Sequence, residues 1–290
     1  MKVSGFTIVR NAVKYDYPVV ESISSILPLC DEVIVAVGDS EDGTRALVES
    51  IGSPKIRIID TVWDDSLRKG GEVLAIETNK AFDAISPEST WAVYIQADEV
   101  LHEEGYGKLR NAMERWESQP EVEGFIVDYL HFYGSYDFIA DSRKWYRKEV
   151  RIIRNDKKIR SYKDAQGFRK EGKKLAVKPT GVIMCHYGWV KPPESIRSKL
   201  QYFHTLWHDE EWMEKNKTQL ESFDYSGIDS LVLFQGTHPS IMQKRISGKN
   251  WKFDFDPIRK KFPPVSKLLN WIENKTGILP GEYRNYKIAK

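Results

Sequence analysis

Cysteine is scarce in this chain, with two residues among 290. Cys30 and Cys185 each adjoin an apolar segment, and neither has a partner at the spacing of a metal-binding set. A disulfide framework and a cysteine-based zinc site are therefore not expected. We expect both thiols to be buried, reduced and without a chemical role.

Long apolar runs are also absent, since no segment approaches the roughly 18 residues of a membrane-spanning helix. The N-terminal MKVSGFTIVRN lacks the apolar core and cleavage site of a signal peptide, so we expect a cytoplasmic protein. Neither sign of charge dominates, because 44 basic and 42 acidic residues leave a formal charge of +2. This balance argues against bulk binding to nucleic acid, while local basic patches could still meet a phosphorylated ligand.

Several motifs of nucleotide and metal chemistry are missing as well. The chain has no GxxxxGKS/T phosphate loop and no GxGxxG dinucleotide turn, which removes the main support for an ATPase or a Rossmann dehydrogenase. It has no HExxH motif, so a zinc protease is not supported. With 41% hydrophobic and 12% aromatic residues, the composition is that of an ordinary globular protein.

The first hundred residues alternate between strand and helix patterns. Short apolar runs predict strands at 3–9, 33–37, 56–62 and 91–96. Apolar stripes at helical spacing predict helices at about 18–27, 44–51 and 75–85. Strict alternation of this kind is typical of an α/β fold with a mostly parallel sheet flanked by helices.

The second half of the chain is less regular. It contains a helix stripe at 109–116, three longer aromatic and β-branched strands, two polar aromatic loops and an amphipathic helix from Pro193. The strands are predicted at 124–133, 145–154 and 176–186, and the loops at 133–137 and 161–169. We see no repeat, low-complexity tract or linker, which favours one domain over 1–190 with a C-terminal helical extension over 191–290.

Carboxylates follow two of the predicted strands. Asp39 comes directly after the second strand, and Asp98 and Glu99 end the buried run WAVYIQ. Ligands of open α/β sheets collect at the carboxyl ends of the strands, where such acids can hold a divalent cation. The alternative is that these acids solvate the loop or cap the next helix.

Three segments in this order resemble a known family. IVRNA, DEVIVAVGDSEDGT and WAVYIQADEV are similar to the nucleotide-binding half of family-2 glycosyltransferases of the GT-A fold. The resemblance covers residues 1–105, with a weaker similarity through His186, and marks 1–105 as the nucleotide-binding half of the catalytic domain. It implies transfer of a sugar from a nucleoside-diphosphate sugar, with UDP-sugar the first choice, to a hydroxyl of a glycan or glycolipid in polysaccharide biosynthesis.

The resemblance also assigns roles to individual residues. Asp39 would contact the nucleoside, with Arg10 and Asn11 beside it. Asp98 matches the last acid of the family's Asp-x-Asp motif and would bind Mn²⁺ or Mg²⁺. Gln96 stands where the first acid is expected, and its amide can contact the ribose instead.

A late histidine completes the metal site implied by the resemblance. His186 closes a predicted strand, where family members often place a metal-binding histidine. The competing interpretation is a packed or hydrogen-bonded structural histidine. Glu99 is left to hold the loop or to make a contact behind the ligands.

The chemistry implied by the resemblance is a single inverting displacement. A carboxylate deprotonates the acceptor hydroxyl, and cations neutralise the leaving diphosphate. Asp164 is our candidate for the base, because it precedes a polar turn that suits an acceptor cleft, although an ordinary turn residue is the competing interpretation. The other candidate bases are Asp128, Asp137 and Asp141, and the candidate diphosphate partners are Arg10, Lys69, Arg169 and Lys191.

Two functions from other classes stay open. A sugar-nucleotide pyrophosphorylase would be expected to carry a glycine-rich loop after the first strand, and IVRNA has no glycine. A non-catalytic sugar-nucleotide-binding or scaffold protein on the same fold is supported by Gln96 in place of an acid.

The helix from Pro193 raises a membrane option. It combines Arg197 and Lys199 with aromatic Tyr202, Phe203 and Trp207, which is compatible with peripheral contact at the inner face of the membrane. Core packing is the alternative use of the same aromatic residues.

Overall fold

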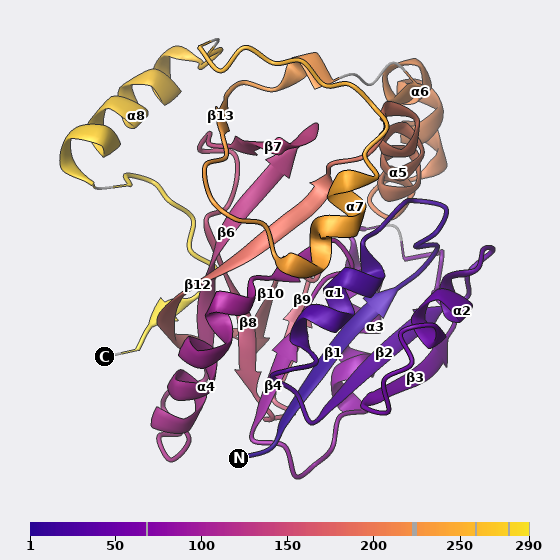
Figure 1. Cartoon of the computed structure of the whole chain (residues 1–290), viewed down its shortest axis with the longest axis vertical. Helices are drawn as coiled ribbons and strands as arrows, with labels where there is room; N and C mark the ends of the chain where they lie inside the picture. Colours follow the sequence, from indigo (N-terminus) through magenta and orange to yellow (C-terminus); the bar gives the residue numbers. More distant parts are fainter. Residues whose placement is uncertain (68, 222–224, 259, 278, 290) are drawn as a thin grey trace.

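We describe the chain from a computed structural model that covers residues 1–67, 69–221, 225–258, 260–277 and 279–289. An 11-stranded sheet runs through the molecule, with helices packed against it and the last hundred residues wrapped around one end (Figure 1). A separate 3-stranded sheet stands beside it.

The parallel half of the large sheet has the order β3-β2-β1-β4. Its strands are β1 (Val3–Val9), β2 (Glu32–Gly38), β3 (Ile56–Thr61) and β4 (Trp91–Tyr94), and its helices are α1 (Val19–Ile26), α2 (Thr44–Glu49) and α3 (Glu72–Asp83). Each element lies where the sequence pattern predicts it, with boundaries shifted by a few residues. The predicted α/β class, a mostly parallel mixed sheet flanked by helices, is confirmed.

Alternate side chains of the same strands enter two different cores. In β2, Val35 and Val37 belong to one hydrophobic cluster, while Ile34 and Ala36 belong to the other. Helix α1 covers the first cluster and α3 covers the second. Both faces of β1, β2 and β4 are therefore buried, which is why these segments are continuous apolar runs in the sequence, whereas the edge strand β3 exposes Arg57 and Asp60.

The other half of the sheet is mixed in direction. Strand β8 (Lys148–Arg154) pairs antiparallel with β4, β6 (Gly124–Tyr133) pairs antiparallel with β8, and β12 (Ala176–Trp189) runs parallel to β6. The short β5 (Glu99–Leu101) pairs with β12, and α4 (Tyr106–Arg115) packs close by. This arrangement brings His186 of β12 into register with Glu99.

Two predicted loops are in fact hairpins. Strand β7 (Ser135–Ala140) turns back on β6 at Gly134, whose φ of 70° suits a residue without a side chain. Strands β9 (Ile159–Tyr162) and β10 (Gly167–Lys170) flank the turn 163–166 and form the small sheet with β11 (Lys173–Lys174). The loop predictions were wrong here because polar and aromatic residues pair across strands as readily as they form loops.

Residues from 191 onward form the predicted helical extension. It contains α5 (Pro193–Thr205), α6 (Glu210–Glu221), α7 (Gln243–Ser247) and α8 (Pro264–Thr276). Two short strands join it to the large sheet: β13 (Leu231–Leu233) pairs with β7, and β14 (Lys287–Ile288) pairs with β12. The domain boundary near residue 190 stays a prediction. No helix in the described part of the chain is long and apolar enough to cross a membrane.

Candidate nucleotide-sugar site

A cavity of about 290 Å³ opens at the carboxyl ends of β1 and β4, with α5 forming its opposite wall. Figure 1 shows α5 at the end of the sheet toward which β1 points. The polar and aromatic side chains that line it are Arg10, Tyr17, Trp63, Tyr94, Gln96, Asp98, His131, Trp145, Tyr146, Asp164, His186, Trp189, Lys199, Tyr202 and Phe203. The structure therefore brings five of the predicted residues, Arg10, Gln96, Asp98, Asp164 and His186, to one cavity.

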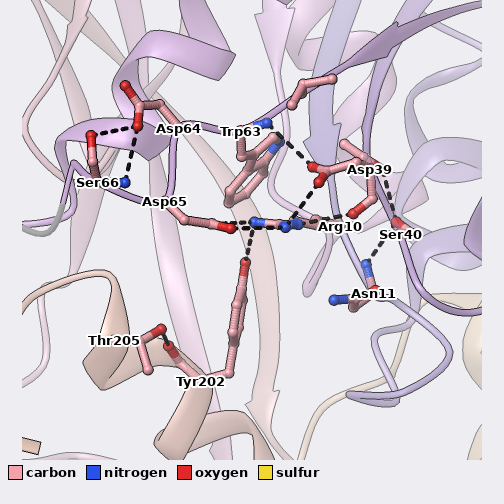
Figure 2. Close-up of polar contacts among 12 residues, drawn as sticks. Arg10, Asn11, Asp39, Ser40, Trp63, Asp64, Asp65, Ser66, Tyr202 and Thr205 are labelled. Carbon is pink, nitrogen blue, oxygen red and sulfur yellow. Dashed lines mark hydrogen bonds and ion pairs between the residues drawn. The ribbon is translucent and has the colours of Figure 1, made fainter. Parts of the chain in front are cut away.

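At one end of the cavity Arg10 lines the wall and pairs with Asp39, which does not itself line the cavity (Figure 2). The Arg10 guanidinium lies between two carboxylates, 3.1 Å from Asp39 Oδ2 and 2.7 Å from Asp65 Oδ1. Its Nη1 also donates to the Tyr202 hydroxyl of α5 at 3.3 Å. Although burial opposes the charge, the hydrogen bond to Asp65 and the nearby anions raise the pKa of Arg10, which stays a permanent cation.

Asp39 is half exposed, and its carboxylate is held at a fixed orientation. Oδ1 accepts a hydrogen bond from the Trp63 backbone nitrogen at 3.2 Å, while Oδ2 faces Arg10. With 44% of its side chain accessible, it can still accept hydrogen bonds from a ligand.

Asn11 fixes the loop next to this end of the cavity. Its backbone adopts a positive φ of 53°, and its side chain is buried. The Asn11 side-chain oxygen accepts from the Glu41 backbone nitrogen at 2.9 Å, and the Asn11 backbone nitrogen donates to Ser40 Oγ at 3.1 Å. Asn11 does not line the cavity; it holds the loop that carries Asp39.

Asp98 forms the other end and is buried. The Lys199 ammonium lies 3.0 Å from Asp98 Oδ2 and also donates to the Gly188 carbonyl at 3.0 Å. His186 Nε2 lies 3.7 Å from the same carboxylate oxygen. Although burial favours the neutral acid, Lys199 and His186 hold the pKa of Asp98 well below its usual range.

Gly188 makes the approach of Asp98 and His186 possible. A Cβ at this position would lie 2.5 Å from Asp98 Oδ2 and 2.8 Å from His186 Nε2, closer than real Cβ atoms come. The HYGW segment therefore needs glycine here, because any side chain would push the carboxylate and the imidazole away.

A second histidine stands behind the first. His131 Nδ1 lies 3.2 Å from His186 Nδ1, and His131 Nε2 lies 2.7 Å from the Tyr146 carbonyl. Burial, together with the neighbouring His186, lowers the pKa of His131 to about 3. Burial also lowers the pKa of His186, although the Asp98 carboxylate works against that shift. Burial therefore favours the neutral form of both imidazoles, the form in which a histidine binds a metal.

A fully buried ion pair fixes the loop between β4 and β5. Arg151 donates to both oxygens of Glu99, at 2.9 and 2.7 Å, and neither side chain is exposed. Glu99 Oε2 accepts from the Gln96 backbone nitrogen at 3.1 Å, while Arg151 Nη1 donates to the Gln166 carbonyl at 2.9 Å. The pair thus ties the loop of Gln96 and Asp98 to the turn that contains Asp164.

Asp164 lies on that turn, between β9 and β10, and faces the cavity. Its two neighbours, Lys163 and Ala165, have positive φ angles of 54° and 59°. The Ala165 carbonyl accepts from Gln96 Nε2 at 3.4 Å, so the turn contacts the β4 side of the cavity directly. Burial raises the pKa of Asp164, which makes its carboxylate a stronger base.

Other predicted residues lie elsewhere. Arg169 does not line the cavity, because its guanidinium is buried against the Phe168 and Asn285 carbonyls, at 2.8 and 3.0 Å. Lys69 is exposed, and Lys191 is buried behind Asp98 with its ammonium 4.6 Å from the Tyr17 ring centre. Burial and the nearby Lys199 lower the pKa of Lys191 to about 7.

The alternative base candidates are also outside this cavity. Asp128 and Asp141 line a second cavity of about 390 Å³, which shares His131, Trp145 and Tyr146 with the first. Asp128 pairs with Lys148, and Asp137 accepts a hydrogen bond from Ser135 within β7.

Sequence reasoning missed the position of Lys199. The sequence pattern associates Lys199 only with the membrane option of this helix, whereas the structure places it inside the cavity with 13% of its side chain exposed. The spacing could have shown this, since Lys199 lies three residues after Ile196 and four before Phe203, on the same helical face. Tyr202, Phe203 and Trp207 pack against the second core cluster, so the core-packing alternative holds for these aromatic residues.

Asp98 and His186 fit part of a divalent metal site. The described residues contain no group of three or more His, Cys, Asp and Glu side chains that could hold a metal. The pair offers one oxygen and one nitrogen, which Mn²⁺ accepts, and phosphate oxygens of a substrate can complete the set. Because Lys199 contacts the same carboxylate, a cation would take this place in exchange for the ammonium.

Comparison with known proteins yields structural likeness alone. No family model matches the chain, and no curated protein matches it. A crystal structure of S. aureus TarS 1-349 matches with a TM-score of 0.40 and 12% identity, over 74% of this chain and 69% of that one.

Two further solved structures show the same low similarity. Glucosyl-3-phosphoglycerate synthase from Mycobacterium tuberculosis, in complex with Mn²⁺, UDP and phosphoglyceric acid, matches with a TM-score of 0.30 and 19% identity, over 45% of this chain and 43% of that one. The 4-diphosphocytidyl-2C-methyl-D-erythritol synthase from Anaerococcus prevotii matches with a TM-score of 0.40 and 10% identity, over 76% and 96%. With TM-scores this low, the function of this chain has to rest on its own cavity.

Proposed function

We propose that the protein is a glycosyltransferase that moves a sugar from a nucleoside-diphosphate sugar to a hydroxyl acceptor, with inversion and with a divalent cation. The donor is a UDP-sugar, and the acceptor is a glycan or glycolipid of polysaccharide biosynthesis at the inner face of the membrane. The observation that carries the proposal is one cavity at the carboxyl ends of parallel strands, with Asp98, Asp164 and Arg10 in its walls and Asp39 bonded to that Arg10.

The Asp39 end suits a nucleoside. Its half-exposed carboxylate can accept hydrogen bonds from a base or ribose, and Arg10 beside it supplies a fixed cation. The Trp63 ring lies 5.5 Å from the Arg10 guanidinium carbon and gives this end an aromatic wall. Gln96 lines the cavity between the two ends and can donate to a ribose hydroxyl, as its amide does to Ala165 here.

The Asp98 end suits the diphosphate. Asp98 and His186 would hold Mn²⁺ or Mg²⁺, which when bound neutralises charge on the leaving nucleoside diphosphate. Lys199, once released from Asp98, stays within reach of the same phosphates and can donate hydrogen bonds to them. Gly188 leaves the space in which these groups meet.

Asp164 is the proposed base. Its carboxylate accepts the proton of the acceptor hydroxyl as that oxygen attacks the anomeric carbon and the bond to the diphosphate breaks. The raised pKa favours this proton transfer, while the Arg151 network keeps the turn at a fixed distance from the donor loop. Asp164→Asn should bind donor normally and lose roughly 10² to 10⁴ in turnover. Near-normal turnover would show that Asp164 is not the base and would leave Asp128, Asp137 and Asp141 as the candidates.

Calorimetry tests the binding part of the proposal. UDP should bind in the presence of Mn²⁺, and EDTA should weaken that binding, because Asp98 and His186 alone contact the phosphates poorly without a cation. Titration with ADP, GDP and CDP under the same conditions identifies the preferred base. If no nucleotide binds with or without metal, the glycosyltransferase proposal is wrong.

A second candidate function is sugar-nucleotide binding without transfer. Gln96 replaces an expected acid, and Lys199 occupies the Asp98 carboxylate, so this chain departs from a plain metal site in two places. Slow release of free sugar from a UDP-sugar by the purified protein, absent in Asp98→Asn, would exclude this candidate. Nucleotide binding without any turnover would support it.

A further inference from the structure

Helix α8 exposes an apolar stripe to solvent. Val265, Leu268 and Trp271 are 69%, 58% and 60% exposed. They follow one another at intervals of three residues, which places them along one side of the helix. Ile258, in the segment that leads into the helix, is 89% exposed. Figure 1 shows α8 at the upper left edge of the molecule, away from the parallel half of the sheet.

The opposite side of α8 is fixed to the body of the protein by charge. Glu273, two residues after Trp271, pairs with Arg143 at 3.0 Å and with Arg147. Its side chain is 16% exposed, so the carboxylate points inward. These ion pairs hold the helix in one orientation, with the apolar stripe facing away from the body of the protein.

The exposed charges on α8 itself are positive. Lys267 and Lys275 of α8 are exposed. Lys260, just before the helix, is exposed as well and pairs with Asp141 at 3.3 Å. Glu273 is the acidic residue of the stretch 260–277, and it is already paired with arginine. The exposed carboxylates of the preceding segment, Asp254 and Asp256, come before Ile258. An apolar stripe with a tryptophan, flanked by lysines, matches the interface of an anionic membrane, where the ring lies at headgroup level and lysines contact phosphates.

We infer that α8 is a membrane-surface helix that docks the protein on an anionic lipid bilayer. The helix has 13 residues, about 20 Å at 1.5 Å per residue, and so lies in the interface and does not cross the bilayer. The stripe of Val265, Leu268 and Trp271 enters the acyl boundary, and the lysines bind lipid headgroups. This role belongs to α8 and not to α5, whose aromatic residues are used inside the molecule.

Vesicle flotation tests the inference on the full chain. The protein should float with vesicles of equal parts phosphatidylcholine and phosphatidylglycerol, and stay behind with phosphatidylcholine alone. The double variant Leu268→Ser/Trp271→Ser should lose flotation. Lys267→Glu and Lys275→Glu should each lower the partition coefficient by about fivefold or more, because each lysine near an anionic surface contributes about a factor of five.

Matched controls separate a specific surface from a general loss. Val62→Ser removes an apolar side chain that is 74% exposed near β3, and Lys108→Glu reverses an exposed charge on α4. Both should float like the wild type, and all variants should unfold at the wild-type temperature because the changed side chains are exposed.

Three outcomes would overturn the inference. The first is that the wild type stays in the soluble fraction with both kinds of vesicle. The second is that the α8 variants float as well as the wild type. The third is that size-exclusion chromatography finds a dimer that Leu268→Ser/Trp271→Ser converts to a monomer, which would assign the stripe to a second copy of the chain. None of these results depends on sugar transfer, so nucleotide binding can succeed or fail independently.

Discussion

The two ends of the cavity hold their carboxylates in opposite ways. Asp39 is 44% exposed and shares Arg10 with a second acid, Asp65. Asp98 is 12% exposed and has a lysine and a histidine within 4 Å of one oxygen. The first carboxylate can accept a ligand by adding hydrogen bonds, whereas the second can accept a cation only by releasing one.

The difference shows how position alone divides work between similar groups. Both acids follow a parallel strand, and the sequence pattern alone does not distinguish their roles. Exposure makes Asp39 suited to a polar, neutral part of a ligand, since an exposed ion pair contributes little. Burial makes Asp98 suited to charge, because interactions between ions are stronger where water is excluded.

Replacing Asp98 should have the largest effect. Asp98→Asn removes the charge that binds a divalent ion and should lower Mn²⁺ affinity by at least about 100-fold, since even residues behind a ligand contribute about 10- to 100-fold. Isothermal calorimetry with Mn²⁺ and UDP measures this. Asp254→Asn, at an exposed position, is the control. Equal metal affinity in the two variants would show that Asp98 is not the ligand.

Glu149 sharpens the comparison, because it is as buried as Asp98 but lacks a bonded cation. It is bonded by the amides of Gln166 and Asn285, and burial raises its pKa to about 7. A carboxyl titrates near 4.3 in the unfolded chain, so stability is present below that pH and is lost as pH rises toward about 7. Glu149→Gln should therefore be more stable than the wild type at pH 8, by about 2–4 kcal/mol, and equal to it near pH 4.

Urea unfolding of both proteins at the two pH values measures this difference. Asp254→Asn again serves as the control and should follow the wild type at each pH. A Glu149→Gln curve parallel to the wild type across the range would mean that Glu149 is already ionised in the folded protein.

Lys199 tests the exchange at the Asp98 end. Lys199→Met keeps the aliphatic stem and removes the ammonium, so Mn²⁺ no longer displaces a bound cation. Its affinity should rise by about tenfold, the equivalent of one charged hydrogen bond. Arg197→Met, on the outer side of the same helix beside Glu194, should leave the affinity unchanged. Unchanged affinity in Lys199→Met would show that the two cations do not compete.

Asp39 should give the smallest effect. Asp39→Asn retains the side-chain shape and loses a charged acceptor, which should weaken UDP binding by about tenfold or less. The loss should be the same with Mn²⁺ and with EDTA, because this end does not contact the metal. Competition binding with uridine measures the nucleoside contribution alone, and a loss seen only with metal would contradict the division between the ends.

The sequence predicted the first hundred residues well for a physical reason. Strands buried on both faces must be apolar throughout, and this requirement is visible without a structure. The burial of Cys30 and Cys185 follows in the same way and is confirmed. The approach of Asp98 to the first strands was also predictable, since the carboxyl ends of parallel strands share one edge.

The missing parts depend on contacts between distant residues. Lys199 meets Asp98 across 101 positions, and Arg151 meets Glu99 across 52. No local pattern reports which cation reaches which acid, because the helix and strand that carry them are placed by packing. Arg169 shows the reverse error, where a polar turn suggested a ligand contact and the guanidinium is buried against carbonyls.

Lys199 gives the Asp98 end a counterion that cannot diffuse away. Because the ammonium is tethered through α5, its effective concentration at the site stays high whether or not it touches the carboxylate. A cation that replaces it leaves a free positive charge a few ångströms from the incoming phosphates. Lys199 therefore neutralises Asp98 when no metal is bound and neutralises the phosphates when a metal replaces it. The charge balance at this end of the cavity depends less on the ions of the surrounding solution.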